Sequence, residues 1–327
     1  MRRRAFVAGL GCAVACPPAT IAQQTDRVRR VGVLMRVTER DADGQARLSA
    51  FVEGLKKLGW IEGHNLRLDV RWGPDDANRY PRQAAELVAI APDVLVAPTS
   101  FTVSALQRAT RSIPIVFIGV IDPLGADIVP SLARPGGNTT GFIAFEYTIG
   151  GKWLEFLKEI APQVTRAAVL RDASNASGVG QFAAIQAAGI AGIDLSVIGV
   201  KDAEGLERAT PAFASSSNGG LVVTASPFGV NHPEVIAALA AIYKLPAIYP
   251  LNYFIRAGGL IAYGPDLVRQ SGPAAAYVDR VLRCVKPGNL PVQAPTKYES
   301  IINRRAAAAL GLQLSPALLA RADEVIE

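Results

Sequence analysis

Residues 31–35 read Val31-Gly32-Val33-Leu34-Met35, an apolar run in which polar and apolar residues do not alternate. A strand that is buried on both faces of a parallel sheet has this pattern, whereas a strand with one solvent-facing side alternates. The run Ile113-Pro114-Ile115-Val116-Phe117-Ile118 is of the same kind. Both runs therefore predict strands of a parallel sheet, which helices must connect and cover.

Helix-like spacing separates these predicted strands. Apolar residues from Leu48 to Leu58 recur every three or four positions, and Gly59 ends the pattern. The same reasoning predicts the other elements of this half of the chain: strands at 66–72 and 94–96, and helices at 80–91 and 101–109. Such alternation of strands and helices up to Asp122 is typical of an α/β fold with a doubly wound, Rossmann-like sheet.

A second unit of the same type follows a turn-rich interruption. Residues 134–141, Arg-Pro-Gly-Gly-Asn-Thr-Thr-Gly, break the alternation, and we interpret them as the approach to a hinge. The alternation then restarts with a helix at 152–160 and a strand at 167–170. Roughly three hundred residues exceed what one hydrophobic core serves, so we expect two Rossmann-like lobes with a ligand cleft between them. The expected bounds are 28–143 plus about 253–290 for lobe 1, and 144–252 plus about 291–327 for lobe 2.

The first 22 residues have the features of a cleavable export signal. Three arginines at positions 2–4 precede a short run of small apolar residues, and Ala19-Thr20-Ile21-Ala22 precedes the polar Gln23. Arg3-Arg4-Ala5-Phe6-Val7 fits a twin-arginine signal as well as a Sec signal, so both routes stay open. A lipoprotein anchored at Cys16 is a further alternative, which Ala13 disfavours because such signals usually carry Leu there. The sequence predicts export to the periplasm.

Charge and composition exclude several classes of function. Loss of the signal would lower the formal net charge from +6 to +3, and the remaining basic residues are interspersed with acidic ones, which argues against a nucleic-acid partner. Cys284 would be the one remaining cysteine, and we interpret it as structural. His64 and His232 lie far apart in sequence, so no metal site is expected. No Gly-x-Gly-x-x-Gly follows the first strand and no Gly-x-Ser-x-Gly occurs, so we expect neither a cofactor nor an enzyme.

Several long runs carry a specific resemblance to a known family. Among them are residues 109–117 (Ala-Thr-Arg-Ser-Ile-Pro-Ile-Val-Phe), 122–125 (Asp-Pro-Leu-Gly) and 131–141 (Ser-Leu-Ala-Arg-Pro-Gly-Gly-Asn-Thr-Thr-Gly). They resemble the ABC transporter substrate-binding family, in the tryptophan- and tyrosine-binding-protein-like branch of the type I periplasmic binding proteins. The resemblance spans nearly the whole chain beyond the predicted signal. It departs at Ile302-Asn303-Arg304-Arg305, where a Leu-Lys-Thr run is more usual, in the tail and not in the cleft.

This resemblance implies how the protein would work. It implies two α/β lobes joined by three crossings of the chain, a small-molecule ligand held in the cleft, and ABC permease and ATPase subunits as partners. Relatives resemble receptors for aromatic amino acids, so an amino acid or a similar small molecule is the expected ligand. We expect a monomer. The alternative is a periplasmic solute sensor that reports to a membrane receptor.

Candidate ligand-binding residues follow the strands, because ligands bind beyond the carboxyl ends of parallel strands. Met35 would pack on an apolar ligand, and Arg36 would either hold a carboxylate or lie solvated at the rim. Thr99 and Ser100 begin a helix, where they would receive an anionic group, act as an ordinary N-cap, or do both. Asp122 would either pair with an ammonium group or begin a turn before Pro123.

Two further groups of candidates come from the second lobe and the crossings. Asn175 follows the strand at 167–170, and Ser226 and Phe228 follow the strand at 221–224. The residues near the predicted crossings are Phe145, Glu146, Tyr249 and Asn252, where aromatic rings would stack on a ligand or pack the hinge; for Tyr249 we favour packing.

These candidates combine into one hypothetical pose. The carboxylate of an amino-acid-like ligand lies at Thr99 and Ser100, its cationic group near Asp122 or Glu146, and its side chain against Phe228. Closure of the lobes would then bury the ligand and change the surface that the permease meets.

Overall fold

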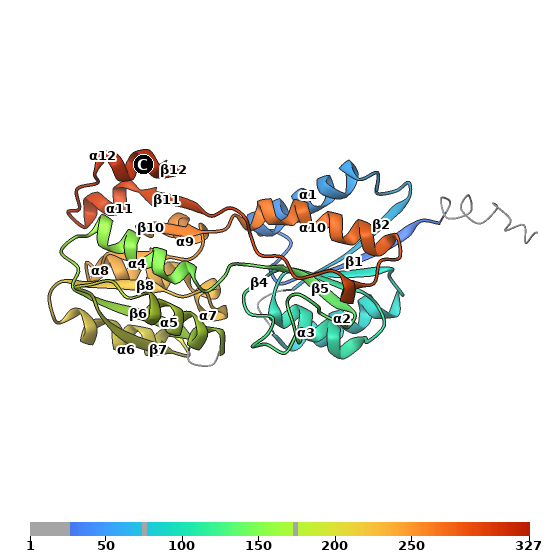
Figure 1. Ribbon diagram of the computed structural model, residues 1–327, viewed down its shortest axis with the longest axis horizontal. Helices are drawn as coiled ribbons and strands as arrows, with labels where there is room; N and C mark the ends of the chain where they lie inside the picture. The colour runs from blue at the N-terminus through green and yellow to red at the C-terminus, as the bar shows by residue number, and fades with distance from the viewer. Residues whose placement is uncertain (1–26, 74–76, 173–175) are drawn as a thin grey trace, which may run out of the picture.

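Two α/β lobes lie side by side, joined by extended segments of chain (Figure 1). The computed structural model describes residues 27–73, 77–172 and 176–327, so the predicted signal, Cys16 and Asn175 lie outside the described residues. The sheet of the first lobe has the strand order β2-β1-β3-β4-β5, and that of the second has the order β12-β11-β10-β9-β8-β6-β7. The prediction of an α/β fold with two Rossmann-like lobes is confirmed.

The first lobe covers both faces of its parallel sheet with helices. Its elements are β1 (Arg29–Met35), α1 (Ala42–Lys57), β2 (Leu66–Trp72), the 3-10 helix Ala77–Arg79, α2 (Tyr80–Ala89), β3 (Val94–Ala97), α3 (Ser100–Ala109), β4 (Ile115–Val120), β5 (Thr139–Ile143), α10 (Leu267–Leu282) and the 3-10 helix Pro287–Asn289. Val31, Val33 and Met35 pack in the cluster formed with α1 and α10, while Leu34 packs in the cluster formed with α2 and α3. This two-sided burial explains why β1 does not alternate in sequence.

The second lobe repeats the arrangement around a wider sheet. Its elements are α4 (Ile149–Ile160), β6 (Arg166–Asp172), α5 (Ala176–Ala188), β7 (Asp194–Val200), α6 (Ala203–Ala214), β8 (Gly219–Val223), α7 (Pro227–Asn231), α8 (Pro233–Ile242), β9 (Ala247–Tyr249), α9 (Tyr253–Arg256), β10 (Ile261–Gly264), β11 (Glu299–Asn303), α11 (Arg304–Ala309), α12 (Pro316–Arg321) and β12 (Glu324–Ile326). All neighbouring strands pair in parallel except β10 and β11.

The second crossing between the lobes lies later than the sequence analysis placed it. Residues 253–264 were assigned there to lobe 1, but β10 is hydrogen-bonded between β9 and β11 in the second sheet. The chain returns to the first lobe only after Gly264, where α10 packs along α1. The sequence pattern of a strand does not indicate which of two sheets it belongs to. Periodicity therefore could not place the boundary between the lobes.

The turn-rich segment before the first crossing ends in a strand that was not predicted. Thr139–Ile143 forms β5, which pairs with β4 and completes the first sheet. The Thr140 hydroxyl donates to the Leu290 carbonyl at 2.6 Å, and the Gln293 amide donates to the Gly141 carbonyl at 2.9 Å. The segment leading to the third crossing is thereby fixed beside the first crossing, so the hinge segments run together.

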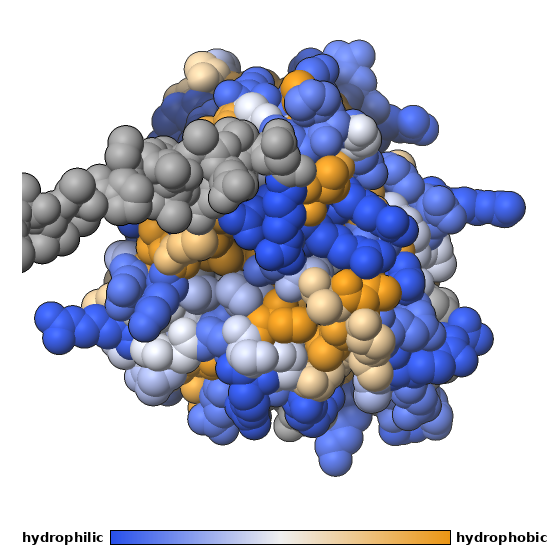
Figure 2. Space-filling view, turned by 90° about the vertical axis from the view of Figure 1, so that its right-hand side faces the viewer, coloured by the Kyte–Doolittle hydropathy of each residue, from blue (hydrophilic) through white to orange (hydrophobic). Residues whose placement is uncertain are grey.

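The outer surface of the first lobe is mainly hydrophilic, because most of its apolar residues are buried in the core. Hydrophilic side chains dominate the end of the first lobe that Figure 2 shows, and hydrophobic residues lie among them in small groups. Within the described residues, no helix is both long and apolar enough to span a membrane.

Gly141 provides a test of how tightly β5 joins the first sheet. A Cβ atom at this position would lie 2.1 Å from the Phe117 carbonyl oxygen on β4, so Gly141→Ala forces the two strands apart. We expect the free energy of unfolding to fall by about 2–4 kcal/mol in urea denaturation, as for other overpacked or strained sites. Gly137→Ala is the control, since a Cβ there meets nothing within 4 Å and should change stability by less than about 0.5 kcal/mol. Equal effects of the two substitutions would contradict the tight β4–β5 contact.

Candidate functional site

The residues that follow the strands of the two lobes meet across the gap between them. Arg36, directly after β1, donates from Nη1 to the Asn231 side-chain oxygen at 2.7 Å, and Asn231 ends α7 of the second lobe. Asp43 on α1 forms an ion pair with Arg256 on α9. Figure 1 shows α7 on the side of the second lobe that faces the first. The candidate site is therefore the cleft between the facing strand ends.

The start of α3 forms part of the first-lobe wall. The Thr99 hydroxyl accepts from the Thr102 amide at 3.4 Å, and the Thr102 hydroxyl accepts from the Thr99 amide at 3.2 Å. This reciprocal pair is a capping box, so the N-cap role of Thr99 is present. Half-buried Ser100 opens the helix, where backbone amides and the positive end of the helix dipole still favour an anion.

Asp122 interacts with a backbone amide in its own lobe and with a tyrosine of the other lobe. Its Oδ1 accepts from the Gly125 amide at 2.8 Å, which is the turn role weighed from the sequence. Burial and the charge of Asp122 raise the pKa of Tyr147, which lies just before α4 of the second lobe. The carboxylate thus stabilises a turn in one lobe and acts on a side chain of the other.

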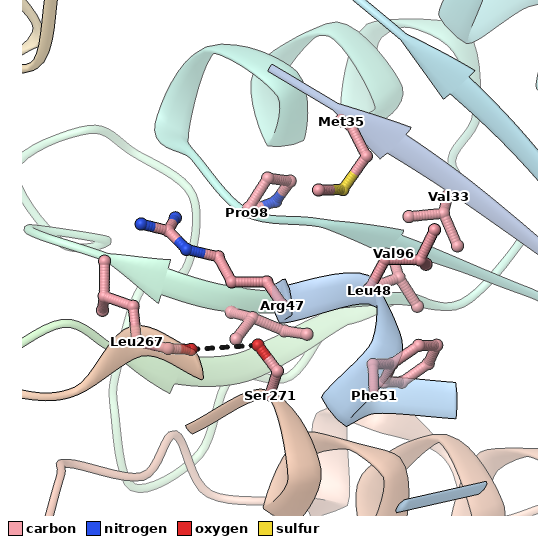
Figure 3. Close-up of a pocket in the computed structure, with 10 residues that line it drawn as sticks. Val33, Met35, Arg47, Leu48, Phe51, Val96, Pro98, Leu267 and Ser271 are labelled. Atoms are coloured by element: carbon pink, nitrogen blue, oxygen red, sulfur yellow. Dashed lines mark hydrogen bonds between the residues drawn. The ribbon is translucent and has the colours of Figure 1, made fainter. Parts of the chain in front are cut away.

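A small apolar cavity lies beneath the cleft at the carboxyl ends of β1 and β3 (Figure 3). Met35 lines it, together with the aliphatic stem of Arg47 from α1. Its volume is about 30 Å³, far below the about 150 Å³ cavity that binds benzene, so an aromatic ring does not fit there. The Arg47 guanidinium points out of the cavity, past Pro98 and Leu267 (Figure 3).

Arg47 and Tyr253 each hold a buried polar atom that lacks a hydrogen-bond partner. These atoms are Nε of Arg47 in the first lobe and the hydroxyl of Tyr253 in the second. Burial lowers the pKa of Arg47, and nearby Asp43 opposes that shift. Burial raises the pKa of Tyr253, while Arg36 and Arg47 lower it, so the hydroxyl lies within the field of both arginines.

Other predicted residues of the second lobe cap or pack instead of facing the cleft. Buried Ser226 caps α7, where its hydroxyl accepts from the Gly229 amide at 3.0 Å. Phe145, Phe228 and Tyr249 are at most 6% exposed. Phe145 packs edge-on against Trp153, Phe228 lies against His232, and Tyr249 stacks on Phe254.

These burials change what the strand-end reasoning expected of the aromatic residues. In this arrangement of the lobes, the rings of Phe145 and Phe228 pack within the second lobe, and so does the ring of Tyr249, for which we favoured packing. Position after a strand does not determine the direction of the side chain, so counting from strand ends could not separate these cases. Glu146 is exposed, and Asn252 is half-buried directly before α9.

Three residues of the cleft were missed by the sequence analysis: Arg47, Tyr147 and Tyr253. None of them directly follows a central strand of a lobe, so counting from strand ends does not reach them. Arg47 did leave a signal, since it lies four residues before Phe51 and eight before Leu55, on the buried stripe of α1. A charged residue on an apolar stripe requires a reason, and a binding role is one.

The described residues contain no group of three or more His, Cys, Asp or Glu side chains placed to hold a metal ion. The polar groups described above are hydroxyl, carboxylate, phenol and guanidinium groups.

Comparison with known proteins places this architecture in a family. Residues 30–326 match the model of the family described as ABC transporter substrate binding protein. A tyrosine-binding protein from Clostridioides difficile is 25% identical over 264 residues, covering 80% of this chain and 76% of that protein.

Solved structures agree with this assignment. A conserved domain protein from Vibrio cholerae is 29% identical with a TM-score of 0.81, covering 91% of this chain and 100% of that chain. The ABC domain from Streptococcus pneumonia in complex with L-Trp is 22% identical with a TM-score of 0.82, covering 91% of this chain and 99% of the other. The second of these likenesses shows the fold, which is that of the type I periplasmic binding proteins. The chain belongs to the ABC transporter substrate binding protein family, whose members are binding components of transporters and not enzymes.

Proposed function

We propose that this protein is the extracytoplasmic solute-binding component of an ABC importer and captures an amino acid by closure of its two lobes. The observation that carries the proposal is the meeting of polar side chains from both lobes, shown by the Arg36–Asn231 hydrogen bond and the Asp43–Arg256 ion pair. The relatives that bind tyrosine and L-Trp make aromatic amino acids the first candidates for the ligand. An export signal at residues 1–22 would deliver the protein to the periplasm, and a monomer would deliver the ligand to the permease and ATPase subunits.

The proposed pose uses the polar groups of the first lobe. The ligand carboxylate lies at the start of α3, near Thr99 and Ser100, because the unpaired amides and the helix dipole favour an anion there. The ammonium group lies near Asp122, with exposed Glu146 as the alternative partner. Phe228 is too buried to offer a ring face in this arrangement, so the pose does not retain its predicted contact.

Four other predicted residues surround this pose. Met35 lines the apolar cavity under the cleft, and Arg36 spans to the second lobe. Ser226 fixes the start of α7, and Asn252 lies directly before α9. We propose that they shape the cleft and position the elements that touch the ligand.

Closure requires a ligand that contacts both lobes. A ligand shifts an equilibrium between open and closed forms only by the difference in its affinity for the two forms. The Asp43 and Arg256 side chains are 30% and 57% exposed, so their ion pair contributes at most about 1 kcal/mol to the closed form. The ligand itself must therefore supply most of the closing free energy.

Calorimetry with L-tryptophan and L-tyrosine tests the pose. Asp122→Asn keeps an acceptor for the Gly125 amide and removes the charge, so we expect the Kd to rise about 10-fold or more, as for loss of a charged hydrogen bond. Ser100→Ala should raise the Kd by about 3- to 10-fold. Ser104→Ala on the same helix and Asp194→Asn at the exposed start of β7 are the matched controls. Unchanged affinity in both Asp122→Asn and Ser100→Ala would rule out this pose.

Loss of the Asp43–Arg256 ion pair should have a smaller effect on the Kd. Asp43→Asn leaves the ligand contacts in place but weakens the closed form, so we expect the Kd to rise by about two- to fivefold at low salt. High salt screens exposed charges and should reduce the difference between Asp43→Asn and the wild type. Titrations at low and high ionic strength measure both quantities. A loss of affinity that is large and independent of salt would show that Asp43 contacts the ligand instead.

A further inference from the structure

Arg47 combines a packed aliphatic stem with a buried Nε that has no hydrogen-bond partner, which a purely structural role does not explain. Its aliphatic stem is packed among apolar side chains, and its guanidinium emerges between Pro98 and Leu267 (Figure 3). Nε is buried without a hydrogen-bond partner, and no ion pair joins Arg47 to another residue in the described part of the chain. A buried Nε–H without a hydrogen-bond partner is costly, so this arrangement destabilises the empty protein.

The acidic residues near Arg47 are engaged elsewhere. The Asp41 carboxylate accepts from the Gly44 amide at 2.6 Å and caps α1, and the Asp43 carboxylate pairs with Arg256. Both charges act on Arg47 through space, but neither provides the missing hydrogen-bond acceptor. Within the described part of the chain, Nε of Arg47 thus has no acceptor, and a bound ligand can supply one.

Tyr253 brings a matching group from the other lobe. Its ring stacks on Phe254, with centroids 4.7 Å apart, and its hydroxyl is buried without a partner. Tyr253 lies three residues before Arg256 on α9, and Arg47 lies four residues after Asp43 on α1, so the Asp43–Arg256 ion pair joins the two helices that carry them. Among the described residues, Arg47 and Tyr253 thus offer unpaired donors from opposite lobes, on the two helices that this ion pair joins.

We propose that Arg47 and Tyr253 form a carboxylate clamp: each lobe supplies one hydrogen-bond donor, and together they bind the carboxylate of the ligand. The clamp rests on the proposed function and gives it a ligand class: a small molecule with one carboxylate. The carboxylate accepts from the Arg47 guanidinium and the Tyr253 hydroxyl, next to the α3 amides that follow Pro98. Because each lobe supplies one donor, both bonds form only when the lobes are together.

The surroundings of the clamp favour a monoanion. A single carboxylate satisfies one guanidinium and one neutral phenol, whereas a phosphate would bring a second negative charge close to Asp41 and Asp43. A cation or a neutral sugar would leave the guanidinium without a counter-charge. The clamp therefore separates carboxylates from the corresponding neutral amides.

The test compares acids with their amides in matched variants. Calorimetry measures L-tryptophan and L-tyrosine against L-tryptophanamide and L-tyrosinamide, which replace the carboxylate by a neutral amide. Arg47→Met keeps the packed stem and removes the guanidinium, so we expect the Kd of the acids to rise about 10- to 100-fold and that of the amides by less than about threefold. Tyr253→Phe keeps the ring and should raise the Kd of the acids by about 3- to 10-fold. The controls are Arg82→Met on the surface of α2 and Tyr243→Phe at the end of α8.

Thermal melting separates recognition from a structural role. Arg47→Met removes a buried unpaired polar atom, so the melting temperature of the ligand-free protein should stay the same or rise, although affinity falls. Should Arg47→Met not fold, Arg47→Lys carries the test: it keeps the charge but loses Nε, and should still raise the Kd of the acids at least about fivefold.

The outcomes separate a failure of the clamp from a failure of the proposed function. Wild-type affinity for the acids in both Arg47→Met and Tyr253→Phe overturns the clamp and leaves the proposed function standing. A wild-type protein that binds the amides as tightly as the acids also overturns the clamp alone. A wild-type protein that binds no amino acid overturns both proposals.

Discussion

The structure depends on the direction of its parallel strands. Because strands of one parallel sheet run the same way, all of their carboxyl ends lie at one edge, and the turns that follow them carry the exposed functional groups. Three crossings of the chain bring two such edges together in this protein. Arg36 after β1 and Asn231 at the end of α7 meet for this reason, although 195 positions separate them in the sequence. A sheet of antiparallel strands would spread the same residues over two opposite edges.

The sequence was most informative where burial leaves a periodic trace. Val31 to Met35 lack alternation because both faces of β1 are covered, and the apolar spacing of α1 follows from its contact with β1 and α10. Information about sheet membership is not local, which is why β10 was assigned to the wrong lobe. The short α9 was missed for a related reason, since four residues show no period.

The candidate site was less predictable than the fold. Strand-end counting predicted that Thr99, Ser100 and Asp122 lie at the edge of the sheet, because their backbone positions alone bring them there; their contact with a ligand stays a prediction. It misjudged Phe228, because the direction of a side chain depends on packing with residues distant in sequence. It missed Arg47, whose signal is a contradiction between two local patterns: a charged residue on the buried stripe of a helix. Natural sequences break such local rules mainly at functional sites, so a charged residue on an apolar stripe itself indicates a functional role.

Closure of the lobes upon a carboxylate unites these observations, and solution X-ray scattering tests it most directly. The radius of gyration of the wild-type protein is measured without ligand and at saturation with the amino acid that calorimetry identifies. The account predicts that the wild-type protein has a smaller radius of gyration with ligand than without it. It also predicts that Arg47→Met, compared at the same fractional occupancy, shows no such decrease. A saturated wild-type protein with an unchanged radius of gyration would contradict the account.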